Sequence, residues 1–282
     1  MNVVNNDIEA LEPVEVVLPK KPIKVMLCIP SGRSWEARTS TSVAGLMVHS
    51  VINGIMIGIV NLEGSMITKQ RCDVVEMALQ QKPDYLMFID SDMRFPPDSL
   101  LRLLAHKKDV VGATYNKRVP PYETLGRLKP PRPSDEELAK GGLYPAEQLP
   151  GGMVLIHASV FERLKWPWFF ETYQWPGENG VEAFKEMLRS SYSEIPPDEV
   201  LNSIEGTPLG NWLNELHPKE NVSAWRFLSE DLQFCRKCAK AGIEIHADLS
   251  LTFDVVHLGI LEVTCVPQAT SPKESAITAA VM

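Results

Sequence analysis

The sequence predicts an α/β fold in which helices flank a mainly parallel, Rossmann-like sheet and loop and helical insertions interrupt the regular pattern. The first half alternates short apolar, β-branched runs with segments of helical periodicity. The 282 residues are 44% hydrophobic and 23% charged, which is the composition of a globular chain long enough to bury a large core. Together these observations favour repeated β-α-β units, whose strands run parallel.

The elements of the first half follow one another in order. Strands are predicted at 24–30, 54–61, 84–90 and 109–115, and helices at 40–52, 67–81 and 96–107. In the second helix Ile67, Val74, Val75 and Ala78 recur at helical spacing, and prolines open the third helix. Because ligands of such sheets bind beyond the carboxyl ends of the strands, we expect the functional site there.

The second half is less regular. Residues 119–150 are rich in proline and are predicted to form a long loop or flap without a core element. A strand running into a helix is predicted at 151–164, a partly helical insertion at 176–226, a helix at 229–242 and two short strands at 243–259. The chain is therefore divided into a flexible leader (1–22), one domain (23–262) and a flexible tail (263–282).

The charge and the cysteine content count against nucleic-acid binding and export, although a local basic groove stays open. A net charge of −8 provides no global basic field for nucleic acid or an anionic membrane. The most membrane-like stretch, 43–60, is interrupted by His49, Ser50 and Asn53, so a buried helix followed by a buried strand is favoured over a membrane span. The leader lacks a secretory signal, and five scattered cysteines are typical of reduced thiols, which predicts a cytoplasmic protein.

The stretch YLMFIDSD, residues 85–92, ends a buried strand with two aspartates. Asp90 and Asp92 project to the same side and repel each other unless a positive group lies between them. A divalent cation such as Mg²⁺ or Mn²⁺ would supply that charge, since it binds carboxylates together with phosphate oxygens. The alternative is that Asp92 caps the helix that begins in FPPDSLL.

Three later motifs also carry candidate residues. Glu230 and Asp231 begin a helix, where the helix dipole favours acids, although simple capping by Ser229 is an alternative. His257 ends an apolar strand, where it could be a metal ligand or a packed core residue. The motif GGM, residues 151–153, allows a close approach of the backbone, or forms a plain turn.

The order of these motifs, DSD, DVVGATYNKR, GGMVLI, SEDLQFC and HLG over residues 24–260, resembles nucleotide-sugar glycosyltransferases of the GT-A fold. The likeness is to family-2-like members common in bacteria and phages. It implies that Asp90, Asp92 and His257 hold Mn²⁺ (or Mg²⁺) on the diphosphate of the donor. It also implies that Asp231 is the catalytic base, with Glu230 beside it.

The nucleotide-sugar donor, expected to be a UDP-sugar, requires further contacts. The candidates are Pro30, Ser31 and Arg33 after the first strand, Arg71 at a helix start, Ser91 within DSD, and Lys117 and Arg118 after the fourth strand. Arg71 could instead form a surface salt bridge. Lys117 and Arg118 could neutralise the diphosphate.

The acceptor side is predicted near the glycines and the aromatic run that follows them. Gly151, Gly152, Trp166, Trp168 and Trp175 are the candidates, although most of the aromatic cluster is expected to pack in the core. Stacking on a sugar or base is the alternative. Cys235 and Cys238 form a single C-x-x-C pair, which favours core packing over zinc binding.

The sequence thus predicts a metal-dependent hexosyltransferase that transfers a sugar to an acceptor hydroxyl. A glycan is the expected acceptor, and a hydroxymethylated DNA base stays open because basic residues surround the proline-rich loop, namely Lys117, Arg118, Arg127, Lys129 and Arg132. One alternative is a sugar-phosphate nucleotidyltransferase, but the segment CIPSGRSWEAR is a poor match to the glycine-rich phosphate loop of such enzymes. The other is a non-catalytic nucleotide- or carbohydrate-binding module.

Overall fold

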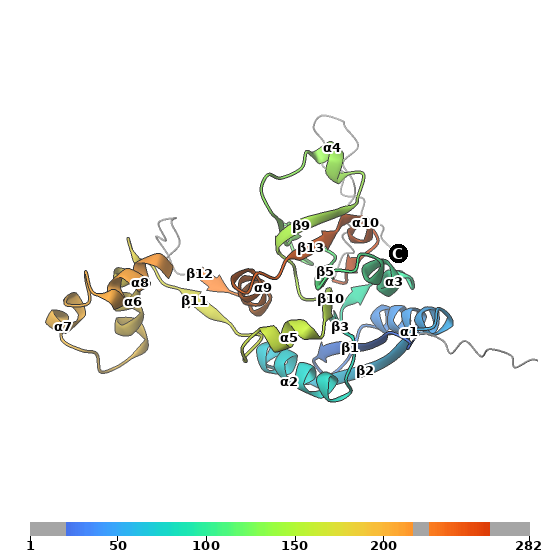
Figure 1. Ribbon diagram of the computed structural model, residues 1–282, viewed down its shortest axis with the longest axis horizontal. Coiled ribbons are helices and arrows are strands. Elements are labelled where there is room, and N and C mark those ends of the chain that lie inside the picture. Colours follow the sequence, from blue (N-terminus) through green and yellow to red (C-terminus); the bar gives the residue numbers. More distant parts are fainter. Residues whose placement is uncertain (1–20, 217–225, 260–282) are drawn as a thin grey trace, which may run out of the picture.

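The computed structural model describes residues 21–216 and 226–259, and an eight-stranded sheet forms its centre (Figure 1). The strand order is β2-β1-β3-β10-β5-β13-β9-β8. Six strands (β2, β1, β3, β5, β13 and β8) run in one direction, and β10 and β9 run in the other. The predicted fold class, a mainly parallel sheet flanked by helices, is confirmed.

The strands of the sheet are β1 (Lys24–Ser31), β2 (Met56–Glu63), β3 (Tyr85–Ile89), β5 (Val110–Gly112), β8 (Arg127–Leu128), β9 (Leu143–Gln148), β10 (Met153–His157) and β13 (Ile245–Asp248). Three two-stranded pairs lie outside it: β4 (Met93–Arg94) with β14 (Val256–His257), β6 (Tyr115–Asn116) with β7 (Thr124–Leu125), and β11 (Thr172–Gln174) with β12 (Arg226–Leu228). The predicted strand 109–115 is therefore split between β5 and β6.

The helices cover both faces of the sheet. One face packs against α1 (Ala37–Ile52), α3 (Ser99–Ala105) and α10 (Leu249–Thr252), and the other against α2 (Ile67–Gln80), α5 (Ser159–Arg163) and α9 (Glu230–Lys240). Side chains along β1 alternate between the two cores, as the pleat requires: Leu27 packs on the first face and Met26 and Cys28 on the second. The remaining helices are α4 (Asp135–Leu138), α6 (Gly180–Ser191), α7 (Asp198–Asn202) and α8 (Pro208–Leu216).

Two predictions were wrong. Residues 143–148 of the proline-rich segment form β9, which pairs with β13 inside the sheet, because Pro145 is exposed and its carbonyl still accepts from the Lys129 amide at 2.9 Å. The strand at 54–61 is β2, which lies at the edge of the sheet and is not buried: Met56 is 52% exposed. The leader and tail fall almost wholly outside the described residues.

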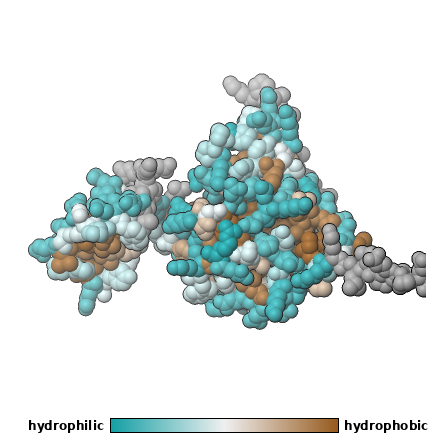
Figure 2. All heavy atoms as spheres, in the orientation of Figure 1, coloured by the Kyte–Doolittle hydropathy of each residue, from teal (hydrophilic) through white to brown (hydrophobic). Residues whose placement is uncertain are grey.

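The described residues 176–216 of the predicted partly helical insertion contain the helices α6, α7 and α8, set to one side of the sheet (Figure 1). Hydrophobic residues gather on this lobe in a surface that is otherwise mainly hydrophilic (Figure 2). Within the described ranges, no helix combines the length and the apolar character needed to cross a membrane.

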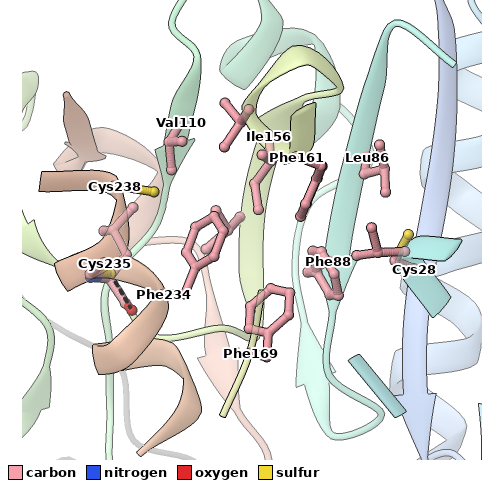
Figure 3. Packing of buried hydrophobic residues seen from close by; sticks show 14 of the residues in the cluster. Cys28, Leu86, Phe88, Val110, Ile156, Phe161, Phe169, Phe234, Cys235 and Cys238 are labelled. Atoms are coloured by element: carbon pink, nitrogen blue, oxygen red, sulfur yellow. Dashed lines mark hydrogen bonds between the residues drawn. The ribbon is translucent and has the colours of Figure 1, made fainter. Parts of the chain in front are cut away.

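The C-x-x-C pair belongs to the core beneath α9 (Figure 3). Cys235 is 2% exposed and Cys238 is fully buried, and the Cys235 thiol lies 3.4 Å from the amide nitrogen of Leu149. Burial raises the pKa of the Cys235 thiol to about 12, so it stays protonated. Both cysteines act as small apolar side chains, as the core interpretation predicts.

We expect Leu155→Ala in β10 to lower the free energy of unfolding by about 2–5 kcal/mol, because Leu155 is 1% exposed in the central core. The same change at Leu209 in α8, which is 47% exposed, should cost less than about 1 kcal/mol. Urea denaturation of both variants measures the difference. Equal losses would contradict the assignment of the core to the sheet.

Candidate functional site

The candidate residues meet at the carboxyl edge of the sheet. Asp90 directly follows β3, and Gly151 and Gly152 directly precede β10, which runs antiparallel beside β3. The Asp90 amide donates to the Gly152 carbonyl at 3.2 Å. The antiparallel insertion of β10 thus brings the start of GGM to the place where the DSD motif emerges.

Arg71 on α2 is the centre of this arrangement. Its guanidinium donates through Nη2 to Asp90 (2.8 Å), through Nε to Glu230 (3.2 Å) and through Nη1 to the Gly151 carbonyl (3.2 Å). Arg71 is only 3% exposed, so the alternative of a surface salt bridge was wrong. One buried cation joins α2, β3, the turn before β10 and α9.

The charges around Arg71 depend on one another. Burial alone would lower the pKa of Arg71, but the charges of Asp90 and Glu230 raise it above the ordinary value, so the guanidinium stays charged. Burial also raises the pKa of Glu230, and Arg71 opposes that rise. The charge of Arg71 thus favours the ionised form of Glu230, and the charges of Asp90 and Glu230 favour the ionised form of Arg71.

The two glycines are required by close contacts. A Cβ on Gly152 would lie 2.4 Å from the Tyr115 hydroxyl oxygen, and one on Gly151 would lie 2.7 Å from Nη2 of Arg71. The Tyr115 hydroxyl accepts from the Gly152 amide at 2.9 Å. The prediction that GGM allows close approach of the backbone is confirmed, and the neighbours are side chains of this chain.

Asp92 lies in a separate cluster with His257 and Arg118. The antiparallel pair β4–β14 aligns Met93 with His257, which brings Nε2 of His257 to 3.3 Å from Oδ2 of Asp92. Arg118 Nη1 contacts the same oxygen at 2.5 Å. Burial would raise the pKa of Asp92, but the hydrogen bond and charge of His257 and the charge of Arg118 lower it below the ordinary value.

The two aspartates therefore face different cations. Asp90 binds Arg71, and Asp92 binds Arg118, so the chain itself supplies positive groups to both carboxylates. Asp92 does not cap α3, since Asp98 occupies the N-cap position and its side chain makes no capping bond. Nor is His257 a plain core residue, because it is paired with Asp92.

The protein supplies only some of the ligands that a metal ion would need near Asp92 and His257. In the described part of the chain no cluster of three or more His, Cys, Asp or Glu side chains could hold a metal ion. The pair Asp92 and His257 nevertheless suits Mn²⁺, which accepts a carboxylate and an imidazole and takes its other oxygens from water and a bound phosphate. The donor set thus fits a metal shared with a diphosphate.

The acids of α9 lie on the other side of Arg71. Asp231 lines a small cavity together with Arg71 and Gly151. The Ser229 hydroxyl donates to Asp231 and makes no capping bond to the helix, so simple capping by Ser229 was wrong. Glu230 is tied to Arg71, whereas Asp231 is not bonded to it.

The first loop lies close to the DSD motif. The Glu36 amide donates to the Ser91 carbonyl at 2.9 Å. Pro30 and Ser31 are buried at the end of β1, and Arg33 is exposed in the loop. Lys117 is paired with Glu123 at 2.5 Å.

The residues that fix Ser31 were not predicted from the sequence. The Asn61 side chain donates to the Ser31 hydroxyl at 2.8 Å, and the Gln70 side chain donates to the Ser31 carbonyl at 2.7 Å. Tyr115 was missed as well. The sequence did offer a signal for Asn61, because its polar side chain ends the predicted strand 54–61 and ligands of such sheets bind at the strand ends.

The aromatic run divides between two environments. Trp168 donates to the Phe161 carbonyl at 3.0 Å, and Phe169 stacks on Phe234 with centroids 4.9 Å apart (Figure 3). Trp166 is 65% exposed, and Trp175 lines a cleft beside α9. Core packing is confirmed for Trp168 and Phe169 but not for Trp166 and Trp175.

Comparisons with solved structures find similar folds at low identity. A197 from STIV aligns over 86% of this chain and 90% of its own, with a TM-score of 0.45 and 16% identity. A glycosyltransferase involved in glycosylation of the major capsid of PBCV-1 aligns over 72% and 81%, with a TM-score of 0.29 and 12% identity. S. aureus TarS 1-349 aligns over 50% and 48%, with a TM-score of 0.31 and 15% identity.

No protein-family model and no curated protein matches the sequence. With each of these TM-scores below 0.5, the function of this chain is inferred from its own residues.

We expect Arg71→Met to cost about 3–5 kcal/mol at neutral pH, because it leaves buried carboxylates without their cation. The pKa of Glu230 would rise further, so the variant should regain stability relative to wild type as the pH falls and Glu230 becomes protonated. Urea denaturation across pH measures both effects. Arg102→Met, at an exposed pair with Asp254, is the control and should cost less than about 1 kcal/mol. A loss independent of pH would contradict the coupling.

Gly152→Ala should destabilise the protein by about 1–3 kcal/mol, because the added methyl group collides with Tyr115 and Asp90. Adding Tyr115→Phe removes one colliding oxygen and should recover part of the loss. Gly32→Ala, with no atom within 4 Å of the new Cβ, is the matched control. Thermal denaturation of the three variants gives the comparison, and an unaffected Gly152→Ala would exclude the close contact.

Proposed function

We propose that this chain is a metal-dependent glycosyltransferase that moves a sugar from a nucleotide-sugar donor, expected to be a UDP-sugar, to an acceptor hydroxyl. The observation that carries the proposal is the Asp92–His257 pair, 3.3 Å apart at the carboxyl edge of the sheet. Asp231 lines a small cavity with Arg71 and lies on the N-terminal turn of α9. A donor site and a proton acceptor are thus carried by one edge of one sheet.

The donor is bound on the Asp92 side. Asp92 and His257 would hold Mn²⁺, which when bound would stabilise the negative charge of the departing nucleoside diphosphate. Arg118 already contacts Asp92 and is 55% exposed, so its guanidinium can turn to a phosphate oxygen once another cation neutralises Asp92. Asp90 takes no direct part as a ligand in this proposal, since Arg71 holds it.

The acceptor is activated on the α9 side. Asp231 is the better base, because Glu230 is committed to the buried guanidinium of Arg71. The acceptor oxygen attacks the anomeric carbon, the bond from that carbon to the diphosphate breaks, and Asp231 takes the hydroxyl proton. Direct attack of this kind inverts the configuration at the anomeric carbon.

A glycan is the preferred acceptor over DNA. The basic residues around the proline-rich segment are largely paired with acids: Arg127 with Glu147 at 3.0 Å, Arg132 with Asp135 at 3.3 Å, and Lys117 with Glu123. These acids reduce the positive potential that a phosphate backbone requires. The four described cysteines are free and buried, which supports the proposal of a cytoplasmic location.

We expect Asp92→Ala and Asp231→Asn to fail in different ways. Asp92→Ala should lose Mn²⁺-dependent binding of UDP, because a metal ligand is gone, whereas Asp231→Asn should keep binding but transfer sugar about 10²–10⁴-fold more slowly. Electron paramagnetic resonance of Mn²⁺ and hydrolysis of a UDP-sugar panel measure the two properties.

Asp98→Asn is the matched control, because Asp98 lies in the same segment and makes no capping bond. Hydrolysis of UDP-sugars that needs no metal and is retained in both Asp92→Ala and Asp231→Asn would contradict the proposal. Formation of UTP and sugar 1-phosphate from pyrophosphate and the UDP-sugar would instead identify a nucleotidyltransferase.

A further inference from the structure

A cleft of about 690 Å³ lies between α9 and the helical lobe of α6 and α8, with β11 along its side. Neither Asp92 nor His257 lines it. Helix α9 runs beside the β11–β12 pair that leads to the lobe (Figure 1). Its volume is within the range of pockets that bind small organic ligands. The cleft is therefore large enough for several linked rings.

The charges that line the cleft have one sign. Arg236, Lys237 and Lys240 line it, and no Asp or Glu is among the described residues of its wall. Lys237 donates to the Pro167 carbonyl at 2.5 Å, which fixes its position without neutralising its charge. In a chain with a net charge of −8, this wall is a local positive site that suits an anion.

The rest of the wall is aromatic and amide in character. Phe170, Tyr173, Trp175 and Phe184 supply ring faces. Gln174 and Gln233 supply side-chain amides, which can both donate to and accept from hydroxyl groups. Ring faces beside hydrogen-bonding groups suit a ligand that is itself built of hydroxylated rings.

The cleft is connected to the catalytic edge through α9. Gln233, Arg236, Lys237 and Lys240 follow a spacing of three and four residues, so they share one side of the helix. The same spacing continues backward from Gln233 to Glu230 in the first turn. This side of α9 therefore ends at Glu230, the neighbour of Asp231 in the sequence, whereas Asp231 itself lies on the adjacent side with Phe234 and Cys235.

We infer that the cleft binds an acidic saccharide, a segment of the acceptor glycan whose terminal hydroxyl reaches Asp231. This inference rests on the proposed glycosyltransferase function and adds the chemical class of the acceptor. Sulfate, phosphate or carboxylate groups of the saccharide pair with Lys240, and its rings lie against Trp175 and Tyr173. Nucleic acid suits the site less well, because binding its closely spaced phosphates requires a more extended basic surface than three cations provide.

The test measures binding without donor or metal, so that it does not depend on turnover. Calorimetry would compare neutral maltotriose with trisaccharides that carry carboxylate, sulfate or phosphate groups, and with a short oligothymidylate. At least one acidic trisaccharide should bind about tenfold tighter than maltotriose, and its affinity should fall as salt is added.

Two variants assign that binding to the cleft. Lys240→Glu should weaken it by about tenfold, and Trp175→Ala by about fivefold, with Trp175→Phe restoring part of the affinity. Lys140→Glu, an exposed lysine outside the cleft, is the charge-matched control and should bind as wild type does. Thermal denaturation of each variant shows whether its fold is retained.

The inference would be overturned if maltotriose bound as tightly as the acidic trisaccharides or more tightly, or if oligothymidylate bound most tightly. It would also be overturned if nothing bound, or if Lys240→Glu left the binding unchanged. Hydrolysis of UDP-sugars by the wild-type protein is measured separately. Loss of saccharide binding with hydrolysis intact contradicts the cleft alone. Saccharide binding by a chain that hydrolyses no UDP-sugar supports the cleft and contradicts the proposed transfer.

Discussion

A single buried guanidinium organises this molecule. Arg71 is 3% exposed and holds Asp90, Glu230 and the Gly151 carbonyl at once. A charge in such a place is tolerated only with its partners present, because its desolvation costs several kcal/mol. The partners come from β3, from α9 and from the turn before β10, so the same electrostatic requirement sets the position of all three. This edge of the sheet is therefore assembled around one buried cation.

Arg71 also binds only one carboxylate of each neighbouring pair of acids. Asp90 and Glu230 are committed to it, whereas Asp92 faces His257 and Asp231 faces a small cavity. The two aspartates of one motif thus have separate tasks, one structural and one suited to binding a cation. The neighbouring acids of α9 are divided in the same way. Asp90 and Asp92 each have a positive partner of their own, whereas Asp231 accepts from the Ser229 hydroxyl and the Leu232 amide.

Local patterns predicted the elements better than their arrangement. The ends of β3 and α9 were recognisable, because apolar periodicity and helix-start acids are properties of neighbouring residues. The direction of β10 could not be recognised, since side chains alternate between the two faces in the same way in parallel and antiparallel strands. Strand β9 was hidden by Pro145, which has no amide proton to donate but whose carbonyl still accepts from the Lys129 amide. The burial of Arg71 was also out of reach, because it is created by segments 19 and 159 residues away.

The order of strands has a consequence for biosynthesis. Strand β13 lies between β5 and β9, yet it is made long after both of them. The strands β2, β1, β3, β10 and β5 can pair as soon as residue 157 has left the ribosome. Strands β8 and β9 have no place beside them until α9 and β13 emerge. The nascent protein therefore carries an unpaired sheet edge while the whole helical lobe is being translated, which is the interval in which chaperones would shield it.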